Sequence, residues 1–192
     1  MGKLIIVRHG QTQMNADGLF FGKLDPELTD LGKEQAQGAR EKLKAFNYDN
    51  IYSSDLKRAS QTADIVNYLD KEIVYDSRLQ EINFGIFEGL TYSEIKEKYP
   101  EECKESEVNW ETYNFRTGES PREMQARAVS FIKSLDLKKD NLIVTHWGII
   151  GCILSWYLST GLQSYWKYSV HNGGIAVIEF CDDFPVLTGL NI

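Results

Sequence analysis

The chain has 192 residues, of which 42% are hydrophobic, and this composition predicts one domain with a sizeable core. Its 21 basic and 28 acidic residues give a formal net charge of −7, which argues against nucleic acid or a membrane surface as a general partner. The sequence shows no signal-peptide pattern and no apolar run of membrane-spanning length, so we expect a cytoplasmic protein with residues 1–192 in a single domain.

Short apolar runs rich in branched residues alternate with helical patterns along the chain. The runs predict strands at residues 3–7, 50–53, 72–75, 141–145, 174–180 and 185–190, the last two joined at Asp182-Asp183. Helical periodicity and capping signals predict helices at residues 29–46, 55–66, 91–99, 120–135 and 148–161. This alternation predicts an α/β fold with a largely parallel sheet and helices on both faces.

Capping residues support several of these helices. Thr29 is a candidate N-cap, and capping boxes begin at Thr91 and Ser120. The first of these helices is predicted to bury four apolar residues, namely Leu31, Ala36, Ala39 and Leu43. By contrast, residues 101–119 are polar and without clear periodicity, so we expect a long loop there, and such loops are often functional lids.

Charged and imidazole side chains follow several of the predicted strands. Arg8 and His9 end the first strand, where open α/β sheets place their ligands. A guanidinium group binds phosphate oxygens through a planar set of donors, and an imidazole nitrogen can attack phosphorus. Arg58 lies near the start of a helix, Glu81 follows the third strand, and His146 ends the fourth. Each alone has an ordinary structural explanation, but together they predict an anion-binding site.

Longer motifs carry a resemblance across nearly the whole chain. In order, they are RHGQTQMN, DPELTDLGKEQA, YSSDLKRASQTA, LQEINFGIFEG and VTHWGIIG. The chain resembles the histidine phosphatase superfamily, which contains cofactor-dependent phosphoglycerate mutases, the bisphosphatase domain of the bifunctional sugar kinase and α-ribazole phosphatases. The resemblance implies a three-layer α/β sandwich with a mostly parallel central sheet, as in phosphoglycerate mutases.

The resemblance also implies roles for individual residues. His9 is the expected nucleophile and Glu81 the general acid, with Glu119 as the next candidate for the acid. Arg8, Arg58 and a protonated His146 are expected to bind the phosphoryl oxygens. The residues expected to contact the substrate are Asn15, Gly22, Trp147 and Asn172. Trp147 departs from the smaller residue usual in the family, so its ring either narrows the pocket or points away. The implied chemistry requires no metal and no cofactor.

Other departures favour hydrolysis over phosphoryl transfer between substrates. The sequence INFGIFEG after Glu81 lacks the tyrosine and the charged residue with which the mutases hold a second phosphate group. Lys23 and Arg116 are the remaining candidates for such an anchor, so a phosphoglycerate mutase stays an alternative, as does a non-catalytic phospholigand-binding module. Hydrolysis of a small phosphorylated metabolite by a monomer or homodimer is the expected function. The candidate substrates are α-ribazole phosphate, phosphoglycerates, small sugar phosphates and phosphoproteins.

Overall fold

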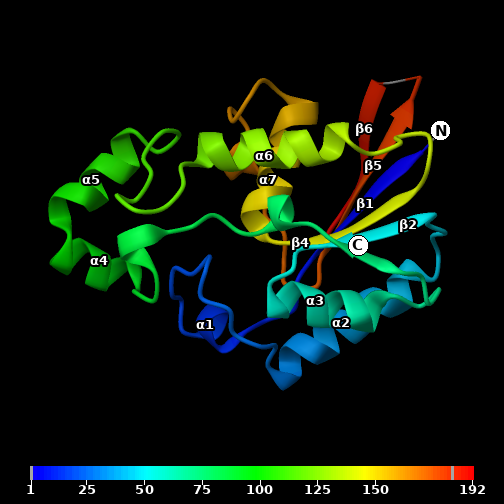
Figure 1. The fold of residues 1–192 in the computed structure, drawn as a ribbon, viewed down its shortest axis with the longest axis horizontal. Helices are drawn as coiled ribbons and strands as arrows, with labels where there is room; N and C mark the ends of the chain where they lie inside the picture. Colours follow the sequence, from blue (N-terminus) through cyan, green and yellow to red (C-terminus); the bar gives the residue numbers. More distant parts are fainter. Residues whose placement is uncertain (1, 183) are drawn as a thin grey trace.

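Six strands form one sheet in the computed structural model, which describes residues 2–182 and 184–192. They are β1 (Lys3–Arg8), β2 (Asn50–Ser53), β3 (Ile73–Tyr75), β4 (Asn141–Thr145), β5 (Ile175–Cys181) and β6 (Phe184–Leu190). Their order in the sheet is β3-β2-β4-β1-β5-β6 (Figure 1). The pairs β1–β4, β2–β4 and β2–β3 are parallel, whereas β5 runs antiparallel to both β1 and β6. The expectation of a mostly parallel sheet with a closing strand pair is confirmed, although Asp183 in the expected turn lies outside the described residues.

Helices cover both faces of this sheet. The longer helices are α2 (Asp30–Leu43), α3 (Lys57–Val66), α6 (Pro121–Lys133) and α7 (Trp147–Leu158). Leu4 and Ile6 of β1 pack into the core formed with α6 and α7, and Ile5 and Val7 pack into the core formed with α2 and α3. Figure 1 shows the two helix pairs on opposite sides of the strands. The alternation of buried residues along β1 therefore produces the expected three layers.

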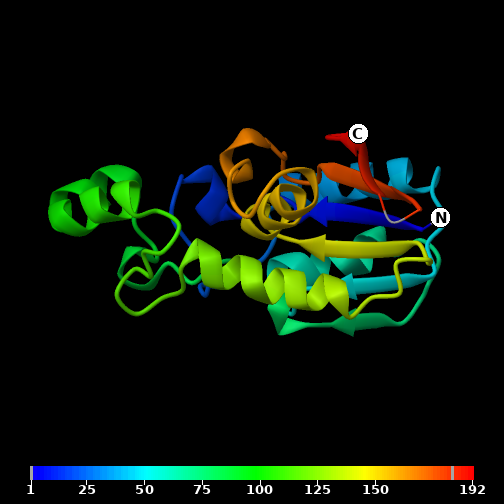
Figure 2. The ribbon, with the colours of Figure 1, turned by 90° about the horizontal axis from the view of Figure 1, so that it is seen from above.

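The remaining short elements lie mostly beyond the carboxyl ends of the strands. They are α1 (Gln13–Ala16), η1 (Ser77–Leu79), η2 (Gly85–Phe87), α4 (Tyr92–Lys98), α5 (Pro100–Val108) and η3 (Tyr165–Lys167), where η marks a 3-10 helix. Figure 2 shows α4 and α5 projecting past the end of the sheet toward which β1 and β4 point. The projection extends the side of the molecule at which Arg8 and His146 emerge.

Capping side chains set the starts of the helices as predicted. The Thr29 hydroxyl accepts a hydrogen bond from the N–H of Gly32, and complete capping boxes begin at Thr91 and Ser120. Each such cap is worth about 1 kcal/mol of helix stability. The predicted ends of two helices lie beyond the observed ones: α2 stops at Leu43 instead of residue 46, and α7 stops at Leu158 instead of residue 161.

Two expectations about local structure are wrong. The loop expected over residues 101–119 contains α5, which begins with Pro100 at its first position and carries two acidic residues in its first turn. Both features favour a helix start, but α5 has no apolar stripe that periodicity could detect. Leu31, expected in the core, is 49% exposed. Gly32 takes the buried position instead, because a side chain there would clash with the backbone of Gln11.

Candidate functional site

Two histidines meet where β1 and β4 end. In the parallel register of these strands Arg8 lies opposite Thr145, so the next residues, His9 and His146, emerge side by side. Their ring centroids are 5.0 Å apart. The backbone N–H of His9 also donates to the carbonyl of Thr145 at 2.9 Å. Strand pairing thus joins two motifs that are separated by more than half of the chain.

The His9 side chain is held as a neutral imidazole with one nitrogen free. Its Nδ1 lies 2.7 Å from the carbonyl oxygen of Gly10, which only accepts hydrogen bonds, so Nδ1 carries the proton and Nε2 keeps its lone pair. Burial lowers the pKa of His9 well below its ordinary value, and the positive charges of Arg58 and Arg8 lower this pKa further. The ring is therefore ready to act as a nucleophile.

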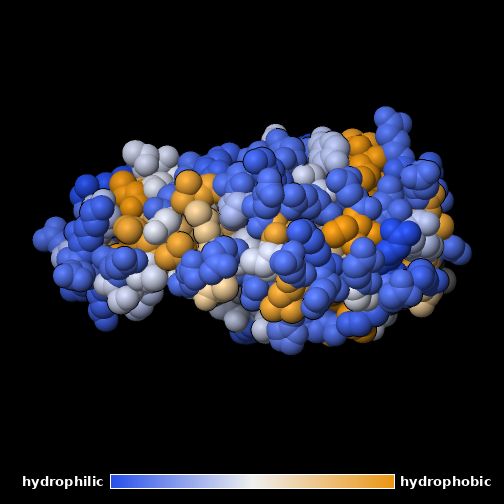
Figure 3. Space-filling view, turned by 90° about the horizontal axis from the view of Figure 1, so that it is seen from below, coloured by the Kyte–Doolittle hydropathy of each residue, from blue (hydrophilic) through white to orange (hydrophobic). Residues whose placement is uncertain are grey.

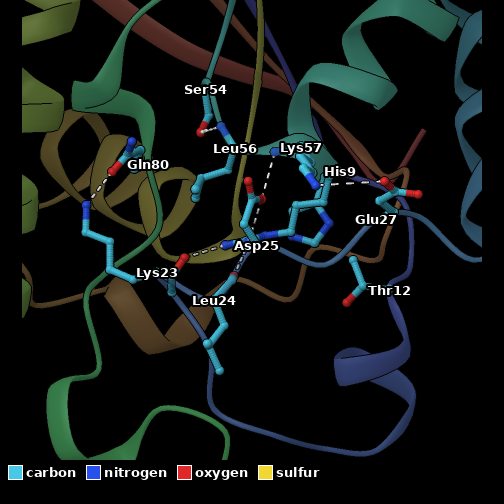
Figure 4. A network of polar contacts seen from close by, with 12 residues as sticks. His9, Thr12, Lys23, Leu24, Asp25, Glu27, Ser54, Leu56, Lys57 and Gln80 are labelled. Atoms are coloured by element: carbon cyan, nitrogen blue, oxygen red, sulfur yellow. Dashed lines mark hydrogen bonds and ion pairs between the residues drawn. The ribbon is translucent and has the colours of Figure 1, made fainter.

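Arg58 is fully buried at the start of α3, and its guanidinium donors are fixed by the protein. Nη2 donates to the carbonyl of Gly22 and Nη1 to that of Leu24, each at 2.9 Å. Nε donates to Nδ1 of His146 at 3.2 Å. The Asp25 carboxylate lies 3.7 Å from Nη1 and accepts from the N–H of Lys57 at 2.7 Å, which ties the Gly22–Asp25 segment to α3 (Figure 4).

His146 is neutral in this arrangement, contrary to the expectation of a protonated ring. Because Nδ1 accepts from Arg58, Nε2 carries the proton and donates to the Ser54 hydroxyl at 2.9 Å. Burial lowers the pKa of His146 well below its ordinary value, and the charge of Arg58 lowers it further. Ser54 is a contact that the sequence did not single out, although it lies within the motif that contains Arg58.

Glu88 organises the loop that holds Arg58. Its Oε1 accepts from the N–H groups of Gly22, Lys23 and Phe84 at 2.8 to 3.0 Å, and its Oε2 accepts from the N–H of Leu24 at 3.2 Å. A side chain at Gly22 would clash with the carbonyl of Ile82. The backbone at residue 22 passes close to the backbone of Ile82, which explains why glycine is required at this position.

Glu81 lies against the amino-terminal end of α7. Its Oε1 accepts from the N–H of Ile82 at 2.9 Å, and its Oε2 accepts from the N–H of Gly148 at 3.2 Å. A helix N-terminus offers free N–H groups and a partial positive charge to a carboxylate. A Cβ at Gly148 would clash with the Glu81 carboxylate. Gly148 therefore allows the Glu81 carboxylate to approach the N-terminus of α7. The sequence analysis did not recognise this role.

The second candidate for the acid, Glu119, is occupied elsewhere. Its carboxylate forms a bidentate pair with Arg127, at 2.6 and 2.7 Å. The other donors of Arg127 bind the carbonyls of Arg78, Gln80 and Glu81. This pair holds the segment before Glu81 in place, and Glu119 does not line the cavity beside His9. Arg127 was not recognised from the sequence, because its motif gives no signal beyond a helical position.

A cavity of about 730 Å³ opens beside His9. Of the residues predicted to form the site, those in its wall are Arg8, His9, Asn15, Arg58, Glu81 and Trp147. Gly22, His146 and Asn172 lie behind the wall: Gly22 and His146 bind Arg58, and the Asn172 side chain donates to the carbonyl of His9 at 3.1 Å. The Trp147 ring lines the cavity, which decides between its two expected placements.

Arg8 lies in the cavity wall and leaves one donor unpaired within the part of the chain that the structure describes. Its Nη1 donates to the carbonyl of Val170 at 2.6 Å, whereas its buried Nε has no hydrogen-bond partner among the described residues. Burial lowers the pKa of Arg8, and the nearby Glu81 charge opposes that shift. The guanidinium group of Arg8 therefore places positive charge beside the cavity, which favours an anionic ligand there.

Neither candidate for a second anion anchor reaches the cavity. Lys23 donates to Gln80 at 2.5 Å, and Arg116 pairs with Glu102, both on the surface (Figure 4 shows the first pair). His171 is exposed, and its backbone N–H binds the side chain of Asn191. Within residues 2–182 and 184–192, no group of three or more His, Cys, Asp or Glu side chains is arranged to hold a metal ion. No helix in that part of the chain is long and apolar enough to cross a membrane.

The family model for the histidine phosphatase superfamily (branch 1) matches residues 4–192. The chain belongs to this superfamily. It is 31% identical to phosphoserine phosphatase 1 of Hydrogenobacter thermophilus, over 100% of this chain and 93% of that protein. It is 30% identical to the adenosylcobalamin/α-ribazole phosphatase of Salmonella typhimurium, over 98% of this chain and 96% of that protein.

The solved structures agree with this assignment. The crystal structure of the α-ribazole phosphatase from Shigella flexneri superposes with a TM-score of 0.92 at 28% identity, covering 99% of this chain and 96% of that one. The resemblance derived from the motifs is confirmed, as is the expected fold. The names of these relatives support a phosphatase, but they differ in substrate.

Proposed function

We propose that this histidine phosphatase is a metal-independent phosphomonoesterase that hydrolyses a small phosphorylated metabolite through a phosphohistidine at His9. One observation carries the proposal. The neutral His9 ring, with Nδ1 fixed on the Gly10 carbonyl, lies in the cavity wall together with Arg8 and Arg58. A lone pair beside two guanidinium groups is the arrangement that displacement at phosphorus requires.

In the first step, Nε2 of His9 attacks phosphorus as the bond from phosphorus to the ester oxygen breaks. Arg8 and Arg58 offset the charge on the other phosphoryl oxygens. A protonated Glu81 gives its proton to the departing oxygen, and the alcohol leaves. His146 and Ser54 contribute by keeping Arg58 in position, since His146 accepts from its Nε.

In the second step, water attacks the phosphohistidine. The Glu81 carboxylate removes a proton from that water, the bond from phosphorus to nitrogen breaks, and inorganic phosphate is released. Glu81 returns to the protonated form and His9 to the neutral ring. The same carboxylate therefore serves both steps, which requires it to remain near the phosphoryl group throughout.

Among specific substrates, we favour α-ribazole 5'-phosphate, because a solved α-ribazole phosphatase superposes with a TM-score of 0.92 and a curated relative is named adenosylcobalamin/α-ribazole phosphatase. A phosphoglycerate mutase is the alternative, but Lys23 and Arg116 lie outside the cavity, so a second phosphate group would lack a cationic partner. A non-catalytic binding module is disfavoured because His9, Arg8, Arg58, His146 and Glu81 are all present and assembled.

The test is to trap the intermediate. Brief mixing with ³²P-labelled substrate followed by an alkaline quench should leave acid-labile, alkali-stable label on the protein. The label should be absent from His9→Ala and retained in His171→Ala, which removes an exposed histidine away from the cavity. Label that persists in His9→Ala would contradict the assignment of the nucleophile.

A further inference from the structure

Many of the side chains that line the cavity beside His9 are aromatic. Among the aromatic residues in its wall are Phe84, Tyr92, Trp110, Trp147, Tyr165 and Trp166. They come from the segments between the strands, including the α4–α5 projection. Figure 3 shows apolar side chains on the surface toward this end of the molecule. A phosphoryl group occupies only the end near His9, so the aromatic region faces the leaving group.

Four of these rings form a continuous wall. Tyr165 is buried, and three tryptophans pack on it: Trp110 with ring centroids 5.7 Å apart, Trp147 at 5.1 Å and Trp166 at 4.9 Å. Burial raises the pKa of the Tyr165 hydroxyl well above its ordinary value, which keeps the wall uncharged. Mutual packing fixes the rings, so they offer a preformed apolar surface.

Trp166 is the unusual member of this wall. Its side chain is 63% exposed although it lines the cavity. Large apolar rings exposed beside a cavity often mark a binding surface. The chain provides an internal comparison in Trp156, which is 41% exposed but lies outside the cavity, with Nζ of Lys133 5.2 Å from its ring centroid.

The positive charges that residues 2–182 and 184–192 place in the cavity wall lie only at the end near His9. Of the described residues in the wall, only Arg8 and Arg58 are cationic, and both lie at the end near His9. The other charged groups are acidic, Glu81 beside the histidines and Glu107 in α5. A carboxylate on the leaving group would find no cationic wall residue among those described beside Trp110, Trp147, Tyr165 and Trp166 and would be repelled by Glu107.

We propose that the substrate's leaving group is an uncharged alcohol with an apolar part about the size of an aromatic ring, which packs against Trp110, Trp147, Tyr165 and Trp166. This specificity rests on the proposed phosphatase function of the His9 site. It separates this chain from enzymes whose substrates carry a carboxylate on the leaving group, as phosphoserine and phosphoglycerates do.

Three primary alkyl phosphates of similar intrinsic reactivity test the proposal: propyl phosphate, 3-phenylpropyl phosphate and 4-(phosphonooxy)butanoate. Release of inorganic phosphate gives kcat/KM for each. Burial of the phenyl ring should raise kcat/KM about 10- to 100-fold over propyl phosphate. The carboxylate should lower kcat/KM below that of propyl phosphate, because its charge is desolvated without a partner.

Two tryptophan variants locate the effect. Trp166→Ala should reduce kcat/KM for 3-phenylpropyl phosphate about fivefold or more while changing that for propyl phosphate less than about twofold. Trp156→Ala removes a partly exposed ring outside the cavity and should change neither value by more than about twofold. Neither ring is buried, so folding should survive each change.

The outcomes test the proposed leaving-group specificity separately from the proposed phosphatase function. Hydrolysis of all three compounds with equal kcat/KM, or with the carboxylate preferred, would overturn the proposed specificity and leave the phosphatase assignment intact. Equal losses in Trp166→Ala and Trp156→Ala would likewise show that the aromatic wall does not contact the leaving group. Absence of turnover with all three compounds, together with no label at His9, would overturn the proposed function and the specificity with it.

Discussion

The rings of His9 and His146 lie 5.0 Å apart because their strands pair in a parallel register one residue before each histidine. Arg58 completes the arrangement, since its Nε donates to His146 and its charge lies beside His9. The pair is therefore unequal. His9 keeps a free Nε2, whereas both nitrogens of His146 are engaged within the protein.

The burial of both histidines predicts how stability depends on pH. The pKa of each buried histidine is lowered well below about 6.5, the value in an unfolded chain. Well above pH 6.5 both rings are neutral in both states. As the pH falls below 6.5, the unfolded chain binds protons that the native protein does not, so the free energy of unfolding decreases, by up to about 1.4 kcal/mol per pH unit for each histidine.

Urea unfolding at pH 7.5, 6.5 and 5.5 measures that decrease, in a range where carboxylates contribute little. His9→Asn preserves a donor to the Gly10 carbonyl and should remove about half of the pH dependence. His171→Asn, a change at an exposed histidine, should leave the dependence unchanged. Identical pH dependence in wild type and His9→Asn would show that His9 is not held neutral.

Glu81→Gln tests the general acid. A proton donor matters most when the leaving group departs poorly, so turnover of an alkyl phosphate should fall by roughly two to four orders of magnitude. With p-nitrophenyl phosphate, phosphorylation of His9 should fall much less, and slow hydrolysis of the phosphohistidine should produce a burst of nitrophenolate. Equal losses in the pre-steady-state rate for both substrates would indicate that Glu81 has only a structural role.

Gly148→Ala tests the placement of the same carboxylate without removing it. The added Cβ would clash with Glu81 and displace it from the N-terminus of α7. Turnover of an alkyl phosphate should fall about tenfold or more, with a smaller loss on p-nitrophenyl phosphate and little change in KM. Gly38→Ala, where a Cβ meets open space, is the matched control. Equal losses on both substrates would mean that the variant disturbs more than Glu81.

Chelation tests whether arginines or metal ions neutralise the phosphoryl oxygens. Arg8 and Arg58 are assigned the neutralisation of the phosphoryl oxygens, so exhaustive treatment with EDTA should leave kcat/KM unchanged, measured by phosphate release. Vanadate, which adopts the geometry of the transition state, should inhibit competitively. Activity that is lost on chelation and restored by a divalent ion would assign this role to the metal instead.

Sequence patterns were sufficient for the parts of the fold that depend on local chemistry. The capping signals at Thr29, Thr91 and Ser120 mark real helix starts, because a cap is a contact between residues three apart. Helix α5 was not predicted from the sequence, because a helix without an apolar stripe has no periodic signal. Leu31 was misplaced because the contact of Gly32 with Gln11 is nonlocal.

The motifs by themselves identified the candidate residues, because the resemblance they carry points to Arg8, His9, Arg58, Glu81 and His146 at the ends of strands and starts of helices. Only the tertiary structure decided the protonation and the position of these side chains. Whether His146 is protonated depends on the Nε of Arg58, and whether Glu81 reaches the site depends on the absence of a side chain at Gly148. The aromatic wall likewise joins residues from separate segments. Such contacts arise between residues distant in the chain, and no local pattern encodes them.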